Sequence, residues 1–195
     1  MTARRVPVVA TIVVALAVAA MIGLGIWQLQ RKTQKETLLA RYAAALTNPA
    51  PVSFPPAGDG AAVLYRIARF DCRVQPGLWD SVAGRNAQGE PGYVHIAHCA
   101  NGAGPDALVQ VGWSRDPHPP VWQGGAVTGR IAPFHRLTRL VAVPPQAGLA
   151  ASAAPDPSTI PNNHLAYAVQ WFLFAGVALV IYALALRRPR RSPAA

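Results

Sequence analysis

The sequence predicts a membrane protein in which two transmembrane α-helices flank a mainly antiparallel, barrel-like β domain, an α+β arrangement. Two observations lead to this prediction. The chain contains two long runs without a charged residue, and several short strand-like segments lie between them, separated by turn residues. The composition agrees, because 52% of the 195 residues are hydrophobic and only 13% are charged, whereas soluble domains carry about 25% charged residues.

The two uncharged runs are long enough to cross a bilayer. Pro7–Ile26 has 20 residues and Leu165–Leu186 has 22, and a helix that rises 1.5 Å per residue needs about 20 residues to span the hydrocarbon core. We predict transmembrane helices at residues 6–27 and 161–186. A cleaved signal peptide is the alternative for the first run. Its apolar core would be only about 7–15 residues long, however, and this run continues into GLGIWQLQR.

Small and aromatic residues occupy defined places on these runs. Ala15, Ala19 and Gly23 recur every four residues, and such a stripe allows close helix packing, so the two spans are expected to pack on each other. Aromatic rings prefer the boundary between membrane and water. Trp27 at the end of the first span, and Tyr167 and Trp171 near the start of the second, therefore indicate anchors at the same boundary.

The basic residues gather at the membrane edges. Of the net charge of +10, the stretch from Tyr42 to Ile160 contributes little, because its eight arginines face seven acids. This distribution argues against a nucleic-acid surface, which needs positive charge clustered on the folded domain. The flanks beyond the spans, residues 1–5 and 187–195, hold six arginines. By the positive-inside rule both would be cytoplasmic. We thus expect a multi-pass protein of the bacterial inner membrane with a periplasmic central domain.

The central part is predicted to begin with a membrane-proximal helix at residues 28–48, ended by Asn48-Pro49. Residues 49–160 then read as a β-rich domain. Its strand-like segments, each followed by turn residues, are LYRIARFDCRV, GLWDSVAG, GYVHIAHC, ALVQVGW and AVTGRIAPF, with RLTRLVAVPP as a further short element. In the first of these segments, alternation places the side chains of Ala68, Phe70, Cys72 and Val74 on one face.

Few residues of this domain suggest chemistry. The sequence HIAHC would place His95 and His98 on opposite faces of a strand, so one metal ion could not bind both. Cys72 and Cys99, the two cysteines of the chain, would form a disulfide in an oxidising compartment, or would be small buried residues. We find no catalytic motif and no carboxylate pair spaced for acid–base work, and we do not expect an enzyme.

His164 stands apart, because it follows the helix start Pro161-Asn162-Asn163 at the membrane boundary. The positive end of the helix dipole favours the uncharged imidazole, which can bind a metal. Ala168, Trp171 and Ala175 follow on the same face, with Tyr167 and Phe174 beside it. A flat apolar macrocycle could lie on this face with its iron on His164. The alternative is an interfacial histidine that hydrogen-bonds to lipid headgroups or water.

Two motifs resemble those of the Surfeit locus protein family, the cytochrome c oxidase assembly factors. GLGIWQLQRKTQKETLL is similar to the family signature LGxWQxxRxxxK, and PNNHLAYAVQWFLFA is similar to NNHxxYAxxWF. Between them YRIARF, GYVHIAHC, ALVQVGWSRDP and VTGRI fall in the order of the family's blocks, so that the resemblance covers nearly the whole chain.

The resemblance implies a chaperone that binds haem a transiently and helps to insert it into the oxidase catalytic subunit. His164 matches the histidine proposed in the family as the iron ligand. The expected partners are that subunit, haem a synthase and the lipid bilayer. Trp27, Tyr167 and Trp171 would line the haem, and Arg31 would pair with a propionate or, alternatively, with a lipid phosphate. The competing interpretation is a scaffold without a cofactor that holds an oxidase subunit.

Overall fold

The computed structural model describes residues 7–55, 60–101 and 104–187. The chain divides into two compact units. The first, which we call the helix pair, takes its described residues from Met1–Leu38 and Ile160–Ala195; the second, the β domain, is Leu39–Thr159. The predicted cytoplasmic N-terminus 1–5 and all but the first residue of the predicted tail 187–195 lie outside the described residues.

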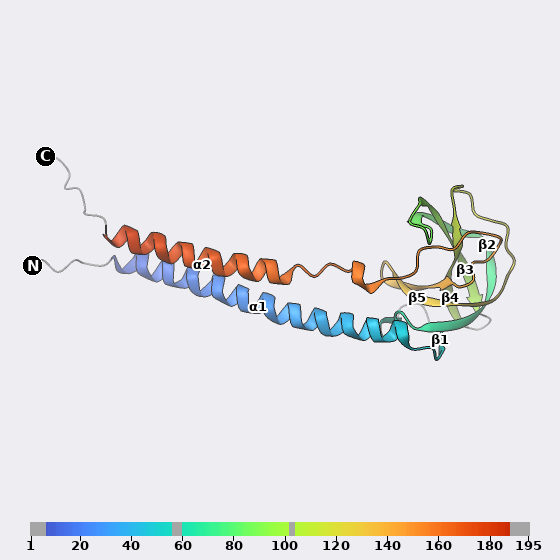
Figure 1. The fold of residues 1–195 in the computed structure, drawn as a ribbon, viewed down its shortest axis with the longest axis horizontal. Coiled ribbons are helices and arrows are strands. Elements are labelled where there is room, and N and C mark those ends of the chain that lie inside the picture. Colours follow the sequence, from blue (N-terminus) through green and yellow to red (C-terminus); the bar gives the residue numbers. More distant parts are fainter. Residues whose placement is uncertain (1–6, 56–59, 102–103, 188–195) are drawn as a thin grey trace, which may run out of the picture. The chain divides into compact units, whose positions relative to one another are not determined.

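Two long helices build the helix pair: α1 (Val8–Thr47) and α2 (His164–Arg187). They lie side by side and run in opposite directions (Figure 1). The hydroxyl groups of Thr11 and Tyr182 form a hydrogen bond at one end, and the side chains of Gln28 and His164 meet at the other. Both helices are long and apolar enough to cross a membrane, and only 11% and 6% of their apolar windows are buried within the structure. The core helix of a soluble domain would be mostly buried.

The helices pack along a seam with alternating spacings of three and four residues, as in coiled coils. The partly or fully buried positions on α1 include Thr11, Val14, Val18, Met21, Gly25, Gln28 and Lys32. Those on α2 include His164, Ala168, Trp171, Ala175, Ala178 and Tyr182.

The predicted small-residue stripe is therefore wrong as the packing face, although the helices do pack. Ala15, Ala19 and Gly23 are exposed, and nothing lies within 4 Å of a Cβ added to Gly23. Gly25 lies in the seam instead, where an added Cβ would come within 2.6 Å of the Phe172 ring. A larger residue at position 25, two residues beyond the stripe, would thus force the Phe172 ring to move.

Within the β domain, the last turns of α1 are held by side chains. The helix ends at Thr47, directly before Asn48-Pro49 as predicted. Arg130 donates hydrogen bonds to the carbonyl of Leu46 and the carbonyl of Tyr65, both at 2.9 Å. A carbonyl at the end of a helix has no partner in the helix itself, so the guanidinium group satisfies one of these and joins the helix end to the sheet.

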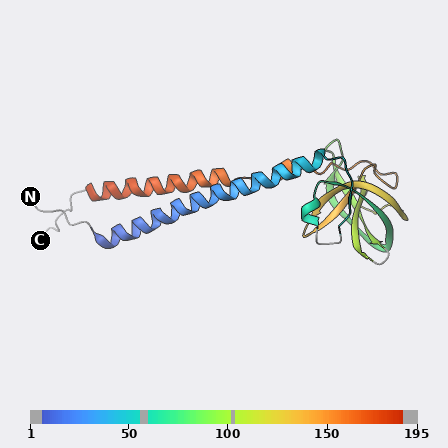
Figure 2. The same ribbon diagram turned by 90° about the horizontal axis from the view of Figure 1, so that it is seen from below.

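The β domain contains one six-stranded sheet and two short 3₁₀ helices. The elements are β1 (Val52–Ser53), η1 (Gly60–Val63), β2 (Ile67–Arg85), β3 (Pro91–Asn101), β4 (Gly104–Ser114), β5 (Gly124–Phe134), β6 (Leu137–Ala142) and η2 (Pro157–Thr159). The strand order is β1-β2-β3-β4-β6-β5, and β2 also pairs with β5. Each strand from β3 to β6 therefore has two neighbours, β2 has three, and the strands are strongly curved (Figure 2).

The predicted antiparallel sheet is only partly right, because the sheet is mixed. β2–β3, β3–β4, β2–β5 and β5–β6 pair antiparallel, whereas β1–β2 and β4–β6 pair parallel. The parallel pair β4–β6 arises because β5 and β6 form a hairpin, and the second strand of the hairpin inserts beside β4. The local sequence indicates the hairpin, but it does not indicate the strand with which the hairpin pairs.

Two predicted strands are a single long one. The Pro76-Gly77 pair suggested a break, yet β2 continues to Arg85, with its pairing to β3 interrupted between Val74 and Trp79. Gly77 has φ of 75°, which a residue without a Cβ adopts readily. An irregularity of this kind lets a strand pass through a proline without ending. The first half of β2 pairs with β5 and the second half with β3.

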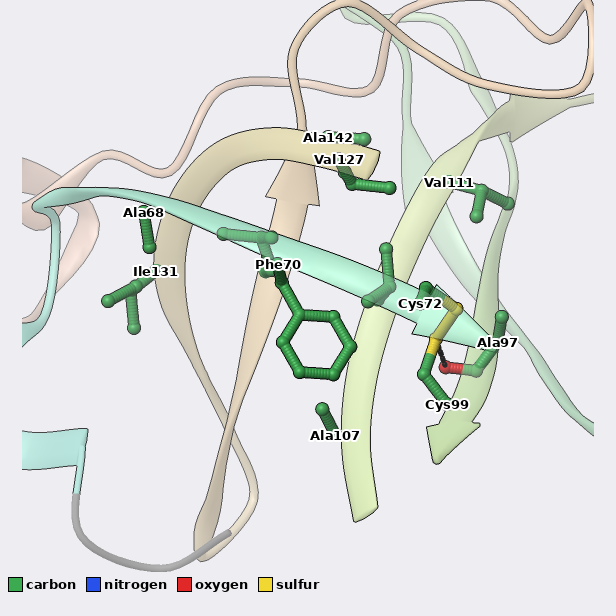
Figure 3. Close-up of a cluster of buried hydrophobic side chains, with 12 residues drawn as sticks. Ala68, Phe70, Cys72, Ala97, Cys99, Ala107, Val111, Val127, Ile131 and Ala142 are labelled. Carbon is green, nitrogen blue, oxygen red and sulfur yellow. Dashed lines mark hydrogen bonds between the residues drawn. A yellow bond between two sulfur atoms is a disulfide. The ribbon is translucent and has the colours of Figure 1, made fainter. Parts of the chain in front are cut away.

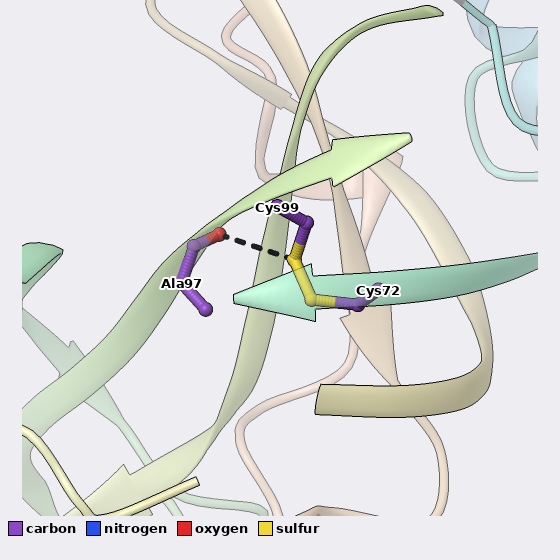
Figure 4. The surroundings of a disulfide bond; sticks show 3 residues. All are labelled: Cys72, Ala97 and Cys99. Atoms are coloured by element: carbon purple, nitrogen blue, oxygen red, sulfur yellow. Dashed lines mark hydrogen bonds between the residues drawn. A yellow bond between two sulfur atoms is a disulfide. The ribbon is translucent and has the colours of Figure 1, made fainter. Parts of the chain in front are cut away.

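The core follows the predicted alternation. Ala68, Phe70 and Cys72 are buried, whereas the residues between them are exposed, and they pack with residues of β3 to β6 in one cluster (Figure 3). Within this cluster Cys72 and Cys99 form a disulfide, with their Cα atoms 5.1 Å apart (Figure 4). Of the two alternatives for the cysteines, the structure therefore has the disulfide, and both residues are also buried in the core.

Candidate metal-ligand site at the helix pair

His164 is the first residue of α2. The helix begins there because the Asn163 carbonyl accepts the first helical hydrogen bond, from the Tyr167 N–H at 3.3 Å. The imidazole is half-buried and occupies the last seam position of the helix pair. It thus lies at a helix N-terminus and is directed toward the neighbouring helix.

The partner of His164 on α1 is Gln28. The Nδ1 atom lies 2.7 Å from the Gln28 Oε1 atom. An amide oxygen only accepts hydrogen bonds, so Nδ1 carries the hydrogen, and in the neutral ring Nε2 keeps its lone pair. Within the described part of the chain, no group forms a hydrogen bond with Nε2. One ring nitrogen held by a protein acceptor and the other left free is the usual arrangement of a histidine metal ligand.

Trp27 and Arg31 lie one helical turn apart on α1, and both are close to Gln28 in the sequence. Trp27 is 46% exposed. The Arg31 guanidinium carbon lies 5.5 Å from the centre of the Trp27 ring, and NH1 donates to Gln34 Oε1 at 3.1 Å. Among the described residues no acid pairs with Arg31. The guanidinium group is therefore held over an aromatic ring with its charge not neutralised.

The residues predicted on α2 have different environments. Tyr167 is 52% exposed, whereas Trp171 is half-buried in the seam, with its ring edge-on to Phe174 at 6.1 Å. No hydrogen bond or ring contact within the described residues joins His164 to Trp27, Arg31, Tyr167 or Trp171. The structure thus brings His164 together with Gln28, and Arg31 with Trp27.

The predicted resting place of a flat macrocycle has to be corrected. It relied on Ala168 and Ala175 as gaps on an open face, but these residues are only 1% and 3% exposed because α1 packs on this face. A macrocycle bound to His164 would therefore have to lie outside the seam.

One feature of the site fits a metal-bearing ligand, the free Nε2 atom of His164. Asn162 Oδ1, two residues earlier, is a buried acceptor that has no hydrogen-bond partner among the described residues. An unsatisfied buried acceptor costs about 1–3 kcal/mol, and its burial keeps this atom out of reach of a bound molecule.

Sequence analysis did not include Gln28 among the site residues. It occurs there only within the motif GLGIWQLQRKTQKETLL. Its place in the seam, where Val18, Met21, Gly25 and Gln28 follow one another at intervals of three, four and three residues, is seen only in the packed helices.

The histidines of the β domain have structural partners. His95 is fully buried between the Ser81 and Ser114 hydroxyl oxygens, both at 2.9 Å. Ser114 donates its hydrogen to the Asp116 carbonyl, so the His95 Nε2–H donates to Ser114, and Ser81 donates to Nδ1. Burial lowers the pKa of His95, with a smaller opposing effect from Asp116.

His98 has a different partner from His95: its Nε2 atom forms a hydrogen bond with the Asp80 Oδ2 atom at 2.9 Å. Asp80 and Ser81 are adjacent on β2, so their side chains point to opposite faces, as do His98 and His95. Among the described residues, no group of three His, Cys, Asp or Glu side chains is placed to hold a metal ion. His95 and His98 thus have separate polar partners on the two faces of β3.

The fold and the site define a class: a protein with two packed apolar helices, suited to membrane association, a folded β domain between them in the sequence, and a histidine at the start of the second helix that is hydrogen-bonded to the first. The profile of the SURF1 family matches residues 15–176. Since this match covers most of the chain, the chain belongs to the SURF1 family, which is linked to cytochrome oxidase assembly. A search among curated proteins gave no match.

Proposed function

We propose that this protein carries haem a during the assembly of cytochrome c oxidase, with His164 as an axial ligand of the iron. The observation that carries the proposal is the hydrogen bond between His164 Nδ1 and Gln28 Oε1. It leaves Nε2 available for a metal at the end of an apolar helix pair. When bound, haem a supplies an iron atom that accepts an imidazole nitrogen as ligand.

The neighbouring residues have distinct roles in this proposal. The exposed rings of Trp27 and Tyr167 offer apolar surface beside the macrocycle, and Trp171 supports the helix seam below His164. Arg31, whose charge no described acid neutralises, is suited to a haem propionate, because its planar fork matches a carboxylate.

We further propose that the protein lies in the bacterial inner membrane with its β domain in the periplasm. The basic flanks support this orientation, and a buried disulfide suits an oxidising compartment. The partners would be haem a synthase, as donor of the haem, and the catalytic subunit of the oxidase, as acceptor. The protein would act as a carrier and not as an enzyme.

The test is a visible spectrum of the full chain, co-expressed with haem a synthesis and purified in mild detergent. We expect a Soret band that is lost in His164→Ala. The matched control is His118→Ala, because His118 is an exposed histidine of the β domain. A wild-type protein without haem, or a His164→Ala variant that keeps the same spectrum, would overturn the carrier proposal.

A scaffold without a cofactor is the second candidate. Exposed apolar side chains on the β domain favour it, with Val121 90% exposed, Val143 61% and Leu78 48%. A colourless wild-type protein that still co-purifies with an oxidase subunit, and loses it when these three residues are changed to serine, would support this candidate over the carrier.

A further inference from the structure

We propose that Gln28 is a positioning residue that sets the tautomer of His164, keeping the hydrogen on Nδ1 and the lone pair on Nε2. The importance of this for haem binding rests on the proposed function. The tautomer itself is a property of the chain alone and can be measured without a ligand.

The geometry leaves one assignment for the shared hydrogen. Gln28 Oε1 lies 2.7 Å from His164 Nδ1, a short distance for a neutral hydrogen bond, and an amide oxygen has no hydrogen to give. A neutral histidine in water favours the opposite tautomer, with its hydrogen on Nε2. In that form the nitrogen that faces away from α1 would be unable to bind a metal.

The packing of the helix pair holds the Gln28 amide in place. Gln28 is half-buried in the seam, and Gly25, one turn earlier, is buried against Phe172. Lys32, one turn later in the same seam, forms an ion pair with Glu36 at 2.7 Å, so its ammonium group has its own partner. The tautomer of His164 therefore depends on correct docking of α1 on α2.

No other glutamine near this level can replace Gln28. Gln30 is exposed, two residues away from the seam position, and Gln34 accepts its hydrogen bond from Arg31. Gln30 is thus a matched control, since it has the same side chain on the same helix but does not face His164.

The decisive experiment is ¹⁵N NMR of histidine-labelled full-length protein without haem, in detergent at pH 8. The His164 signal is identified by its loss in His164→Gln. We expect hydrogen on Nδ1 in the wild type, in Gln30→Leu and in Gln28→Glu, which retains an acceptor. In Gln28→Leu we expect the ratio of the Nε2–H tautomer to the Nδ1–H tautomer to rise by at least about fivefold, the factor that corresponds to one ordinary hydrogen bond.

Each outcome bears on one proposal. A wild type with hydrogen on Nε2, or a Gln28→Leu variant that keeps it on Nδ1, would overturn the role of Gln28. A wild type that binds no haem but shows the expected tautomers would overturn the carrier proposal alone. With haem bound, resonance Raman spectra should show a weaker iron–histidine bond in Gln28→Leu than in Gln30→Leu, because the ligand loses the acceptor that raises its basicity.

Discussion

The cross-link between Cys72 and Cys99 is expected to stabilise the β domain chiefly by restricting its unfolded chain. The bond joins β2 to β3 in the middle of the core, and the cysteines are 2% and 0% exposed. Breaking it by reduction leaves both sulfur atoms in place, so that packing changes little. Changing both residues, as in Cys72→Ala/Cys99→Ala, removes the sulfur atoms as well and leaves a small cavity.

The magnitude follows from the loop that the bond closes. The cysteines are 27 residues apart, and the chain-entropy relation gives about 3.5 kcal/mol for a loop of this length. For a domain of the size of Leu39–Thr159, a loss of 1 kcal/mol lowers Tm by about 3–5 °C. The reduced protein should therefore melt about 10–18 °C lower. The double alanine variant should lose about 1 kcal/mol more, because of the cavity.

The assay is unfolding of the full chain in detergent, by heat or urea, followed by fluorescence of the domain residues Trp79, Trp113 and Trp122. Apolar helices in a micelle resist urea, because their backbone groups are already paired, so the transition reports the β domain. Equal midpoints for oxidised and reduced wild type would refute the reasoning, as would two free thiols in protein purified from an oxidising compartment.

Three further predictions follow. Gly25→Ala should weaken the helix pair by about 1–2 kcal/mol in a helix-association assay, since overpacking exceeds the gain in helix propensity, whereas Gly23→Ala should be neutral or stabilising; equal effects would contradict the packing. The pKa of His95 is lowered on folding, so the unfolded state binds more protons, and the stability of the domain should decrease as the pH falls below about 6.5. In His95→Gln the urea midpoint should depend less on pH. An unchanged pH profile would mean that other groups cause the dependence. In intact cells, Gln88→Cys in an exposed turn should react with a membrane-impermeant maleimide, and labelling only after lysis would reverse the proposed orientation.

The parts of the fold that depend on local sequence were predictable. Helix α1 ends at Thr47, directly before the predicted stop Asn48-Pro49. The alternation in β2 correctly places Ala68, Phe70 and Cys72 in the core. The strand segments were found, but their number and direction were not all correct, because Pro76-Gly77 produces an irregularity within β2 and not a turn.

The candidate site was predictable in part. The position of His164 at a helix start could be read from Asn162-Asn163 and the apolar run that follows. Its partner could not, because Gln28 is 136 residues away in the sequence. The face of α2 on which a macrocycle was expected turned out to be the face that packs on α1.

By itself, the sequence determined that two apolar helices flank a β domain along the chain, because hydropathy and period-two alternation are properties of neighbouring residues. Tertiary structure decided which faces meet. A helix that is apolar all round shows no polar contrast to mark its packing side. The seam is therefore defined only by the fit of the two folded helices, with Gly25 against Phe172 as one of its contacts, and it brings Gln28 to His164. The parallel pairing of β4 with β6 and the bond between Cys72 and Cys99 likewise join distant segments, and depend on the whole chain being folded.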